Sequence, residues 1–576
     1  MSEITPADIP SAPLVGKPLL YFTSVFVSLG VFLFGYDQGY CSGIIVQQSF
    51  KDYFGDPSSS TIGTIVAILE IGALISSFNS GHIGDSLGRR RTIRWGAFIF
   101  CVGGFCQSIA TSVPHMIIGR FISGLGVGLL SSIVPVYQAE ISPPDSRGKL
   151  GCVEFTGNIF GYTSSIWIDY AASFIEKGNL SWRIPLYVQV VFGLILWVGS
   201  FVIVESPRWL LQHDLDAEGI VVIADLYADG EVHSDHAKSE YRSIKEMVLL
   251  DRFEGDKTYF ELLRRYPKRL FVAMSSQFFA QFNGINIISY YAPMVFESAG
   301  WVGRDAILMT GINGLVYILS TIPPWYLVDH WGRKPILISG GLIMGISLYA
   351  VAYFSYLKSE STPQLVVLFV IIYNAGFGYS WGPIAWLLVE CCPYRAKSGA
   401  LSTATNWASN FVVGQLSPIL LEQIKWKLYL IPATFCIVSI LTVHFVYPET
   451  KGLSLEDMDS LFDDRSSIHS SRSNSTYGAT DIEAGQRFIS PSQLARVPGQ
   501  AETQAVASSP FILPQDLEPP DLNAILAYKN SDTNSIRGSL RRGSEAVSSI
   551  FKGLPNKKNR DDSSSVTDDR SERFID

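Results

Sequence analysis

The sequence places one carboxylate and one guanidinium inside stretches that are otherwise apolar. Asp37 lies in the segment LFGYDQG, and Arg120 lies in the segment IIGRFISG. A charged side chain at membrane depth costs free energy unless it faces a hydrated cavity or an opposite charge, so it usually marks a functional position. We expect Asp37 and Arg120 to be partners in the folded protein.

Polar and aromatic side chains also recur inside apolar stretches of the second half of the chain. These residues are Gln281, Asn286, Trp386, Trp407 and Asn410. A hydroxylated solute that leaves water needs replacement hydrogen bonds, and its C–H groups favour an aromatic face. This set can supply both. The alternative is structural, because buried Asn and Gln often bridge membrane helices and Trp favours membrane interfaces.

The elements that must position these residues are long apolar runs. The chain has 576 residues, of which 47% are hydrophobic and only 17% charged. A helix needs about 20 residues to cross about 30 Å of hydrocarbon. We therefore predict an all-α polytopic membrane protein with twelve transmembrane helices. We place them near residues 19–44, 61–82, 92–112, 115–139, 150–170, 184–204, 268–297, 304–328, 335–356, 364–390, 398–421 and 428–447.

The predicted helices divide the chain into five regions. We expect an N-terminal lead (1–18), a six-helix bundle (19–204), a helical linker (205–267), a second six-helix bundle (268–447) and a tail (448–576). The tail is rich in Ser, Asp and Arg and poor in aromatic residues, so it cannot bury a core and should be disordered. The lead lacks a basic region and a cleavage site, so we expect no cleaved signal peptide.

An internal repeat relates the two bundles. The run that begins at Asp85 (DSLGRR) matches the run that begins at Asp329 (DHWGRK), and Glu205 matches Glu449, each at a separation of 244 positions. Two motif pairs with one offset indicate duplicated halves. A parallel duplication of this kind predicts two pseudo-symmetric bundles with a solute site between them near the midplane.

Lysine and arginine set the predicted orientation. Four short loops, after the second, fourth, eighth and tenth helices, hold ten of these residues, whereas the six opposite loops hold about seven. By the positive-inside rule, both termini and the linker should be cytoplasmic.

Acidic and basic residues recur together at the predicted cytoplasmic helix ends. Such groups can form a latch that is made in one conformation and broken in another. The other interpretation is that the basic residues only set topology. Glu390 precedes Arg395 by five residues, whereas Glu140 precedes Arg147 by seven. The shortened loop either weakens the second half of the latch or reflects an irregularity of splicing or of the gene model. The proposed latch residues are Asp85, Arg89, Arg90, Glu140, Arg147, Glu205, Arg208, Asp329, Arg333, Glu390, Arg395 and Glu449.

Many ordered motifs carry a resemblance to one known family. They are GHIGDSLGRRR (81–91), GRFISGLGVGLLSSIVPVYQAEISPPDSRG (119–148), ESPRW (205–209), QFNGINIISYY (281–291), DHWGRK (329–334), WGPIAW (381–386), NWASN (406–410) and PETKG (448–452). Over residues 19–452 the chain resembles the sugar porter family of the major facilitator superfamily, with fungal character. The resemblance implies the major facilitator fold and transport of a sugar or related polyol by alternating access.

The resemblance also implies residue roles. Gln281, Asn286, Tyr290, Trp386, Trp407 and Asn410 take the positions of sugar contacts. In proton-coupled relatives the acid at the Asp37 position titrates and the arginine at the Arg120 position tunes it, which implies proton symport. Two alternatives stay open. The pair can be a permanent structural bridge in a facilitative uniporter, or the chain can be a non-transporting sugar sensor that signals through its long tail.

Four positions depart from the family pattern. Phe155, Ala280 and Tyr317 replace the usual amides, and Gly378 replaces an acid. Asn158 and Asn313, each about one helical turn away from an altered position, can compensate. The departures put glucose in doubt and leave room for pentoses, polyols, disaccharides or an acidic sugar.

Other sequence features exclude further classes of protein function. The sequence shows no nucleotide loop, nucleophile motif or metal-ligand cluster, so we predict no enzyme, no cofactor and no metal. The net charge of −8 gives no indication of nucleic-acid binding.

Expected partners are a small sugar, a proton, the lipid bilayer and possible tail-binding regulators. Asn179 is a glycosylation candidate. We expect the plasma membrane; the DLNAIL motif (521–526) is the one hint of the vacuolar membrane.

Overall fold

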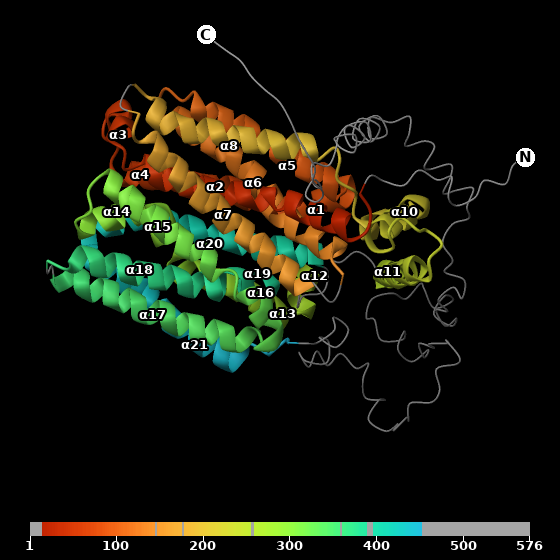
Figure 1. Cartoon of the computed structure of the whole chain (residues 1–576). Coiled ribbons are helices and arrows are strands. Elements are labelled where there is room, and N and C mark those ends of the chain that lie inside the picture. Colours follow the sequence, from red (N-terminus) through yellow and green to blue (C-terminus); the bar gives the residue numbers. More distant parts are fainter. Residues whose placement is uncertain are drawn as a thin grey trace, which may run out of the picture.

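The computed structural model describes residues 14–143, 147–175, 178–254, 258–357, 360–388 and 395–451. All regular elements in these ranges are helices, which confirms the predicted all-α architecture. Six spans form the N-terminal bundle, shown in red to yellow in Figure 1. They are α1 (Lys17–Val27) continued by α2 (Leu29–Ile44), then α4 (Ser59–Leu87), α5 (Arg89–Ser108), α6 (Val113–Ile141), α7 (Arg147–Ala172) and α8 (Leu180–Gly199).

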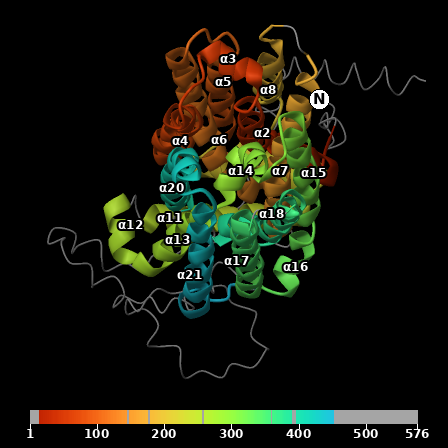
Figure 2. The ribbon, with the colours of Figure 1, turned by 90° about the vertical axis from the view of Figure 1, so that its left-hand side faces the viewer.

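Six further spans form the C-terminal bundle, shown in green to blue beside the first (Figures 1 and 2). They are α13 (Pro267–Phe282) with α14 (Ile285–Ala299), α15 (Arg304–Ser320) with α16 (Pro324–His330), α17 (Arg333–Leu357), α18 (Thr362–Tyr379) with α19 (Trp381–Leu387), α20 (Arg395–Ile424) and α21 (Leu430–Val446). The described residues thus contain the twelve predicted spans.

Hydropathy and length alone identify eight candidate spans in the described residues, one of which, Lys397–Val446, covers both α20 and α21. Three spans escape this criterion, and α7 does so because polar residues such as Asn158 and Asp169 interrupt its apolar run. Helix α5 begins with the basic run RRRTIR, and α13 is separated from α14 by Asn283 and Gly284. Figure 1 shows that these helices still run beside their apolar neighbours.

The break between α13 and α14 brings two predicted site residues together. Gly284 has φ +100°, a backbone conformation that glycine adopts without the strain a Cβ brings. The carbonyl of Asn283, freed by the break, accepts a hydrogen bond of 3.0 Å from the Tyr373 hydroxyl, as a membrane interior requires. Gln281 and Asn286 therefore lie on either side of a fixed kink.

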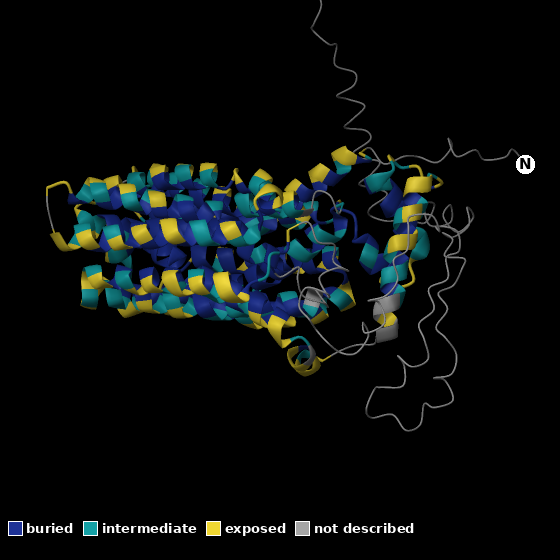
Figure 3. Ribbon diagram, turned by 90° about the horizontal axis from the view of Figure 1, so that it is seen from below, coloured by how far each residue is buried: buried dark blue, intermediate teal, exposed yellow. Residues whose placement is uncertain are grey.

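The outer face of the bundles is apolar and the space between helices is filled. Side chains such as Leu319 and Phe445 are 64% and 78% exposed, which suits contact with lipid tails. Figure 3 shows exposed residues along the outer faces and buried residues between the helices. The chain is therefore packed as a membrane-spanning protein.

Four further helices connect the two bundles in the sequence. They are α9 (Pro207–Gln212), α10 (Asp216–Tyr227), α11 (Asp235–Glu254) and α12 (Tyr259–Arg265). Figure 1 shows α10 and α11 outside the bundle at the end that we call the linker side. The Tyr227 hydroxyl donates to the Ile141 carbonyl at 3.0 Å and ties α10 to α6. The short α3 (Gln48–Phe54) lies at the opposite end, and a 3₁₀ turn, η4 (Lys425–Tyr429), joins α20 to α21.

The linker helices are held together by their own contacts. Lys245 of α11 bridges Asp216 at 2.7 Å and Asp214 at 3.5 Å. A hydrogen bond from Arg252 lowers the pKa of Asp214 from its ordinary value. Apolar side chains, among them Leu211, Ile220 and Val248, form a small separate core. The linker is thus a folded helical unit in its described part.

Candidate functional site

Polar side chains from both bundles meet in the buried centre. We call Gln38, Gln281, Asn286, Tyr290 and Asn410 the polar cluster; all are at most 8% exposed. The Gln38 amide donates to Asn286 Oδ1 at 3.2 Å and to the Tyr290 hydroxyl at 3.3 Å. The Asn286 amide donates to Asn410 Oδ1 at 2.6 Å and also to Gln281 Oε1. These bonds join α2 of one bundle to α13, α14 and α20 of the other.

The cluster contains four of the six predicted substrate residues and one that the sequence reasoning missed. Gln38 directly follows Asp37 in the sequence. Its place next to an acid inside an apolar run could have identified it as a site residue. Trp407 is fully buried, three residues before Asn410; its N–H donates to Ser131 Oγ at 3.3 Å and its ring meets Phe34 at 4.8 Å. It lies between the bundles without bonding to the cluster.

Trp386, the other tryptophan predicted to contact substrate, is not bonded to the polar cluster either. Trp386 is only partly buried on α19, and it makes no hydrogen bond within the described part of the chain. The compensating asparagines differ from each other. The Asn158 amide donates a hydrogen bond to the Val31 carbonyl at 3.1 Å. Both polar side-chain atoms of Asn313 are buried and make no hydrogen bond to the described residues.

Asp37 and Arg120 form the charge pair that their burial demands. Arg120 Nη2 lies 3.2 Å from Asp37 Oδ2, and the two side chains are 1% and 0% exposed. The Tyr40 hydroxyl lies 2.9 Å from Asp37 Oδ1 and accepts from Arg120 Nη1 at 2.9 Å. Arg120 Nη2 also donates to the Val66 carbonyl at 3.0 Å. These additional bonds offset the cost of removing two charges from water.

Helix α2 connects the charge pair to the polar cluster. Asp37 and Gln38 are adjacent residues on this helix, and successive residues of a helix point about 100° apart. One therefore reaches Arg120 on α6, and the other reaches Asn286 on α14. Any shift of α2 moves both sites together.

The structure corrects the prediction that Asp37 and Arg120 are the charges within the apolar runs. Glu70 on α4 and Glu154 and Asp169 on α7 are also buried, with exposed fractions of 0%, 7% and 0%. The carboxylate oxygens of Glu70 and Asp169 have no hydrogen bond in the described structure. Each is a single acid within an apolar stretch, such as IVAILEIGAL around Glu70. This pattern could have predicted that they are buried.

The predicted latch residues of the N-terminal bundle meet at the linker side. Arg89 makes a bidentate pair with Glu140, with both N–O distances 2.9 Å, and contacts Asp85 at 3.1 Å. Glu205 accepts from the backbone N–H groups of Arg89 and Arg90 at the start of α5. A carboxylate at a helix N-terminus is favoured by the helix dipole. Burial raises the pKa of Glu205, and the N–H groups of Ser206 and Arg90 oppose the shift.

The C-terminal bundle repeats this geometry at the offset of 244. Glu449 accepts from the backbone N–H groups of Arg333 and Lys334, each at 3.0 Å. Arg333 lies 4.0 Å from Asp329, a longer contact than its counterpart. Arg208 lies on α9, just after Glu205. Glu390 and the side chains of Arg147 and Arg395 lie outside the described residues.

Two equivalent glycines make these carboxylate sites possible, and their substitution should destabilise the fold. Gly88 and Gly332 have φ +91° and +97°, and an added Cβ would lie 2.7 Å from a Glu205 or Glu449 oxygen. We expect Gly88→Ala and Gly332→Ala each to destabilise the protein by about 1 to 3 kcal/mol, measured by thermal unfolding in detergent. Gly157→Ala is the control, because its Cβ would meet nothing closer than 3.5 Å. Equal melting temperatures would contradict this account.

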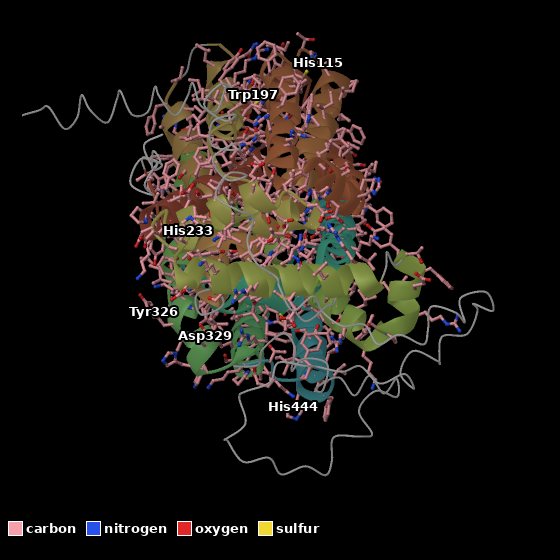
Figure 4. The ribbon with its side chains drawn as sticks, turned by 90° about the vertical axis from the view of Figure 1, so that its right-hand side faces the viewer. His115, Trp197, His233, Tyr326, Asp329 and His444 are labelled. Carbon is pink, nitrogen blue, oxygen red and sulfur yellow. The ribbon has the colours of Figure 1, made fainter. Side chains whose placement is uncertain are left out.

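The two bundles contact each other on both sides of the polar cluster. On the linker side, Trp325 Nε1 donates to Thr156 Oγ1 at 3.1 Å, beside the residues Tyr326 and Asp329 labelled in Figure 4. On the opposite side, Arg304 Nε donates to the Ser173 carbonyl at 3.1 Å, and Gln415 contacts Thr64 at 3.3 Å. Hydrogen bonds between the bundles thus lie on both sides of the polar cluster.

Comparisons with known proteins show the family to which this chain belongs. Residues 23–462 match the family described as Sugar (and other) transporter. The chain is 33% identical over 474 residues to a high-affinity glucose transporter of Kluyveromyces lactis, covering 77% of this chain and 85% of the relative. It is 34% identical over 470 residues to the MFS-type transporter criB of Aspergillus cristatus, covering 79% and 96%.

A solved structure shares the fold. The proton:xylose symporter XylE, bound to 6-bromo-6-deoxy-D-glucose, superposes with a TM-score of 0.68 and 27% identity, covering 77% of this chain and 99% of that one. The predicted fold class and family are therefore confirmed, and the homologues are transporters rather than enzymes. The chain is an integral membrane protein with the major facilitator fold, and it belongs to the sugar porter family of transporters.

Proposed function

We propose that this chain carries a sugar or related polyol across a membrane by alternating access, together with a proton. The observation that carries the proposal is the polar cluster, which draws hydrogen-bonding side chains from both bundles and adjoins a buried acid-base pair. Gln281, Asn286, Tyr290 and Asn410 would bond the hydroxyl groups, and Trp386 and Trp407 would supply aromatic faces. The names of the glucose-transporting and xylose-transporting relatives agree with this substrate class.

Alternating access follows from the contacts between the bundles. Opening toward one side requires only the contacts on that side to separate, while those on the other side hold. The Arg89–Glu140 and Glu449 contacts would then act as the latch on the linker side. We propose that the linker side is cytoplasmic, that both termini lie there, and that the protein resides in the plasma membrane, because the basic residues of the short loops gather on that side.

Proton coupling would act through the charge pair. A proton from water that binds an Asp37 oxygen removes the negative charge, so Arg120 loses its ionic partner but keeps the Tyr40 and Val66 bonds. Release of that proton on the other side restores the pair. Because α2 also carries Gln38, this change reaches the substrate cluster through one rigid helix.

A uniporter is the second candidate, favoured by the burial of the charge pair and the additional bonds that hold Arg120. Both partners are fully buried, and Arg120 also donates to the Tyr40 hydroxyl and the Val66 carbonyl, as expected of a permanent bridge. The sensor alternative is not favoured, because the curated relatives are named transporters.

Sugar uptake in a transporter-deficient host separates these functions. The panel is radiolabelled D-glucose, D-xylose, D-galactose, maltose and myo-inositol, each with and without a protonophore. We expect uptake of at least one member, and we expect the protonophore to abolish accumulation above the outside concentration. Uptake that equilibrates regardless of the protonophore would support the uniporter, and absence of any uptake would contradict sugar transport.

A further inference from the structure

Glu70 is a buried carboxylate that belongs neither to the polar cluster nor to the Asp37–Arg120 pair. It lies on α4, 0% exposed, and neither of its oxygens makes a hydrogen bond within the described structure. An unsatisfied buried polar group costs free energy, and a carboxylate offers about four acceptor sites. A side chain of this kind is expected to have a partner in another state of the molecule.

The surroundings of Glu70 place it at the edge of the polar cluster. Its carboxylate lies beside the Tyr290 hydroxyl of the cluster without a hydrogen bond of normal geometry, and it is influenced by the charges of Arg120 and Asp37. Tyr40, Cys41 and Tyr291 are the other titratable groups of this region. Glu70 thus stands between the two sites through which sugar and proton are proposed to act.

Helix α20 leaves space beside this carboxylate. Gly414 lies one helical turn after Asn410, and a Cβ built on it would lie 3.8 Å from Glu70 Oε1 and 3.5 Å from Ala67 Cβ. The Gly414 carbonyl accepts from Tyr291 at 2.7 Å, which fixes the helix there. Oε1 of this carboxylate therefore lies beside a glycine of α20 at the contact between the two bundles.

We infer that Glu70 is a further substrate-binding residue, which accepts hydrogen bonds from two neighbouring hydroxyl groups of an uncharged sugar or polyol. This rests on the proposed sugar transport. Hydrogen bonds to an ionised carboxylate are roughly twice as strong as those between neutral groups. Two such bonds would replace part of the hydrogen-bonding capacity lost at Phe155, Ala280, Tyr317 and Gly378.

The same residue selects against acidic sugars. The members of the polar cluster are amides and a phenol, and Arg120 is already bonded to Asp37, Tyr40 and the Val66 carbonyl. A sugar carboxylate brought beside Glu70 would add a negative charge where the nearby guanidinium is already engaged, and like charges in a low dielectric repel strongly. Of the substrate classes left open by the sequence, pentoses, hexoses and polyols fit this site and uronic acids do not.

Substitution of Glu70 tests the inference with the panel sugar that the unaltered protein takes up fastest. We expect Glu70→Gln to raise the KM for that sugar by about tenfold or more, because a neutral amide gives weaker bonds and offers only one oxygen. Excess D-glucuronate should not inhibit uptake by the unaltered protein. Glu422→Gln, which neutralises an exposed acid on α20, is the matched control and should leave KM unchanged.

Two additional variants keep the test decisive if Glu70→Gln does not reach the membrane. Glu70→Asp withdraws the carboxylate by one methylene, and Gly414→Ala fills the adjacent space at ordinary contact distance; each should raise KM severalfold. If the unaltered protein takes up no panel sugar, the proposed function fails. If it does take up sugar and the Glu70 variants keep its KM within twofold, or D-glucuronate competes fully, only the role of Glu70 is refuted.

Discussion

Asp37→Asn should convert the protein from a concentrating transporter into an exchanger. At a membrane potential of 100 mV one proton charge supplies about 2.3 kcal/mol, enough for about fiftyfold accumulation of sugar. The amide cannot bind and release that proton, so the accumulation ratio should fall to about one. Exchange of labelled for unlabelled sugar needs no net proton movement and should continue. Both are measured in sealed proteoliposomes with an imposed pH gradient and potential.

The control for this experiment must separate coupling from stability. Asp37→Asn leaves the fully buried Arg120 without its ionic partner, and an uncompensated buried charge costs about 3 to 5 kcal/mol. The double variant Asp37→Asn with Arg120→Gln removes both charges and should recover thermal stability while accumulation stays lost. Accumulation by Asp37→Asn equal to that of the unaltered protein would refute proton coupling through this residue and leave the uniporter.

The fold was largely predictable because a bilayer imposes strict rules on sequence. Apolar length predicts the spans, and the duplicated motifs predict two halves. The offset of 244 recurs in the structure as two equivalent carboxylate sites, Glu205 at the start of α5 and Glu449 at the start of α17. Local chemistry of this kind depends on residues close to fixed helix ends, so sequence determines it well.

The central site was only partly predictable, because it depends on how separate helices face one another. Gln281 and Asn286 flank a glycine that signals a kink, so their proximity could be inferred. Gln38 and Glu70 come from α2 and α4, and their approach to Tyr290 depends on the packing of one bundle against the other. Sequence periodicity gives the face of a helix, but the partner of that face is fixed only by tertiary structure.

The charge pair was also only partly predictable from the sequence. Its formation was predictable from the cost of burying single charges, yet Tyr40 and the Val66 carbonyl complete it. Neither stands out in the sequence, since a tyrosine in a membrane helix is common and a carbonyl is present at every residue. The satisfaction of a buried network therefore had to be read from the structure.

Asn286→Ala should have the largest effect on substrate affinity. The Asn286 side chain donates to Gln281 and Asn410 and accepts from Gln38, so it links α2, α13 and α20 at one point. Its removal deletes a proposed sugar contact and leaves three polar partners to rearrange, each costing about 1 to 3 kcal/mol when unsatisfied. We expect KM for the transported sugar to rise about a hundredfold, measured as initial uptake at fixed pH.

Asn406→Ala provides the matched comparison for that loss. Asn406 is a buried amide on α20, one turn before Asn410, and it donates to Gln277 Oε1 at 2.6 Å, outside the polar cluster. Its substitution removes the same kind of bond from the same helix, so a similar fall in melting temperature is expected with little change in KM. A similar rise in KM for both variants would show that the effect comes from loosening α20, and the assignment of Asn286 to substrate binding would then be withdrawn.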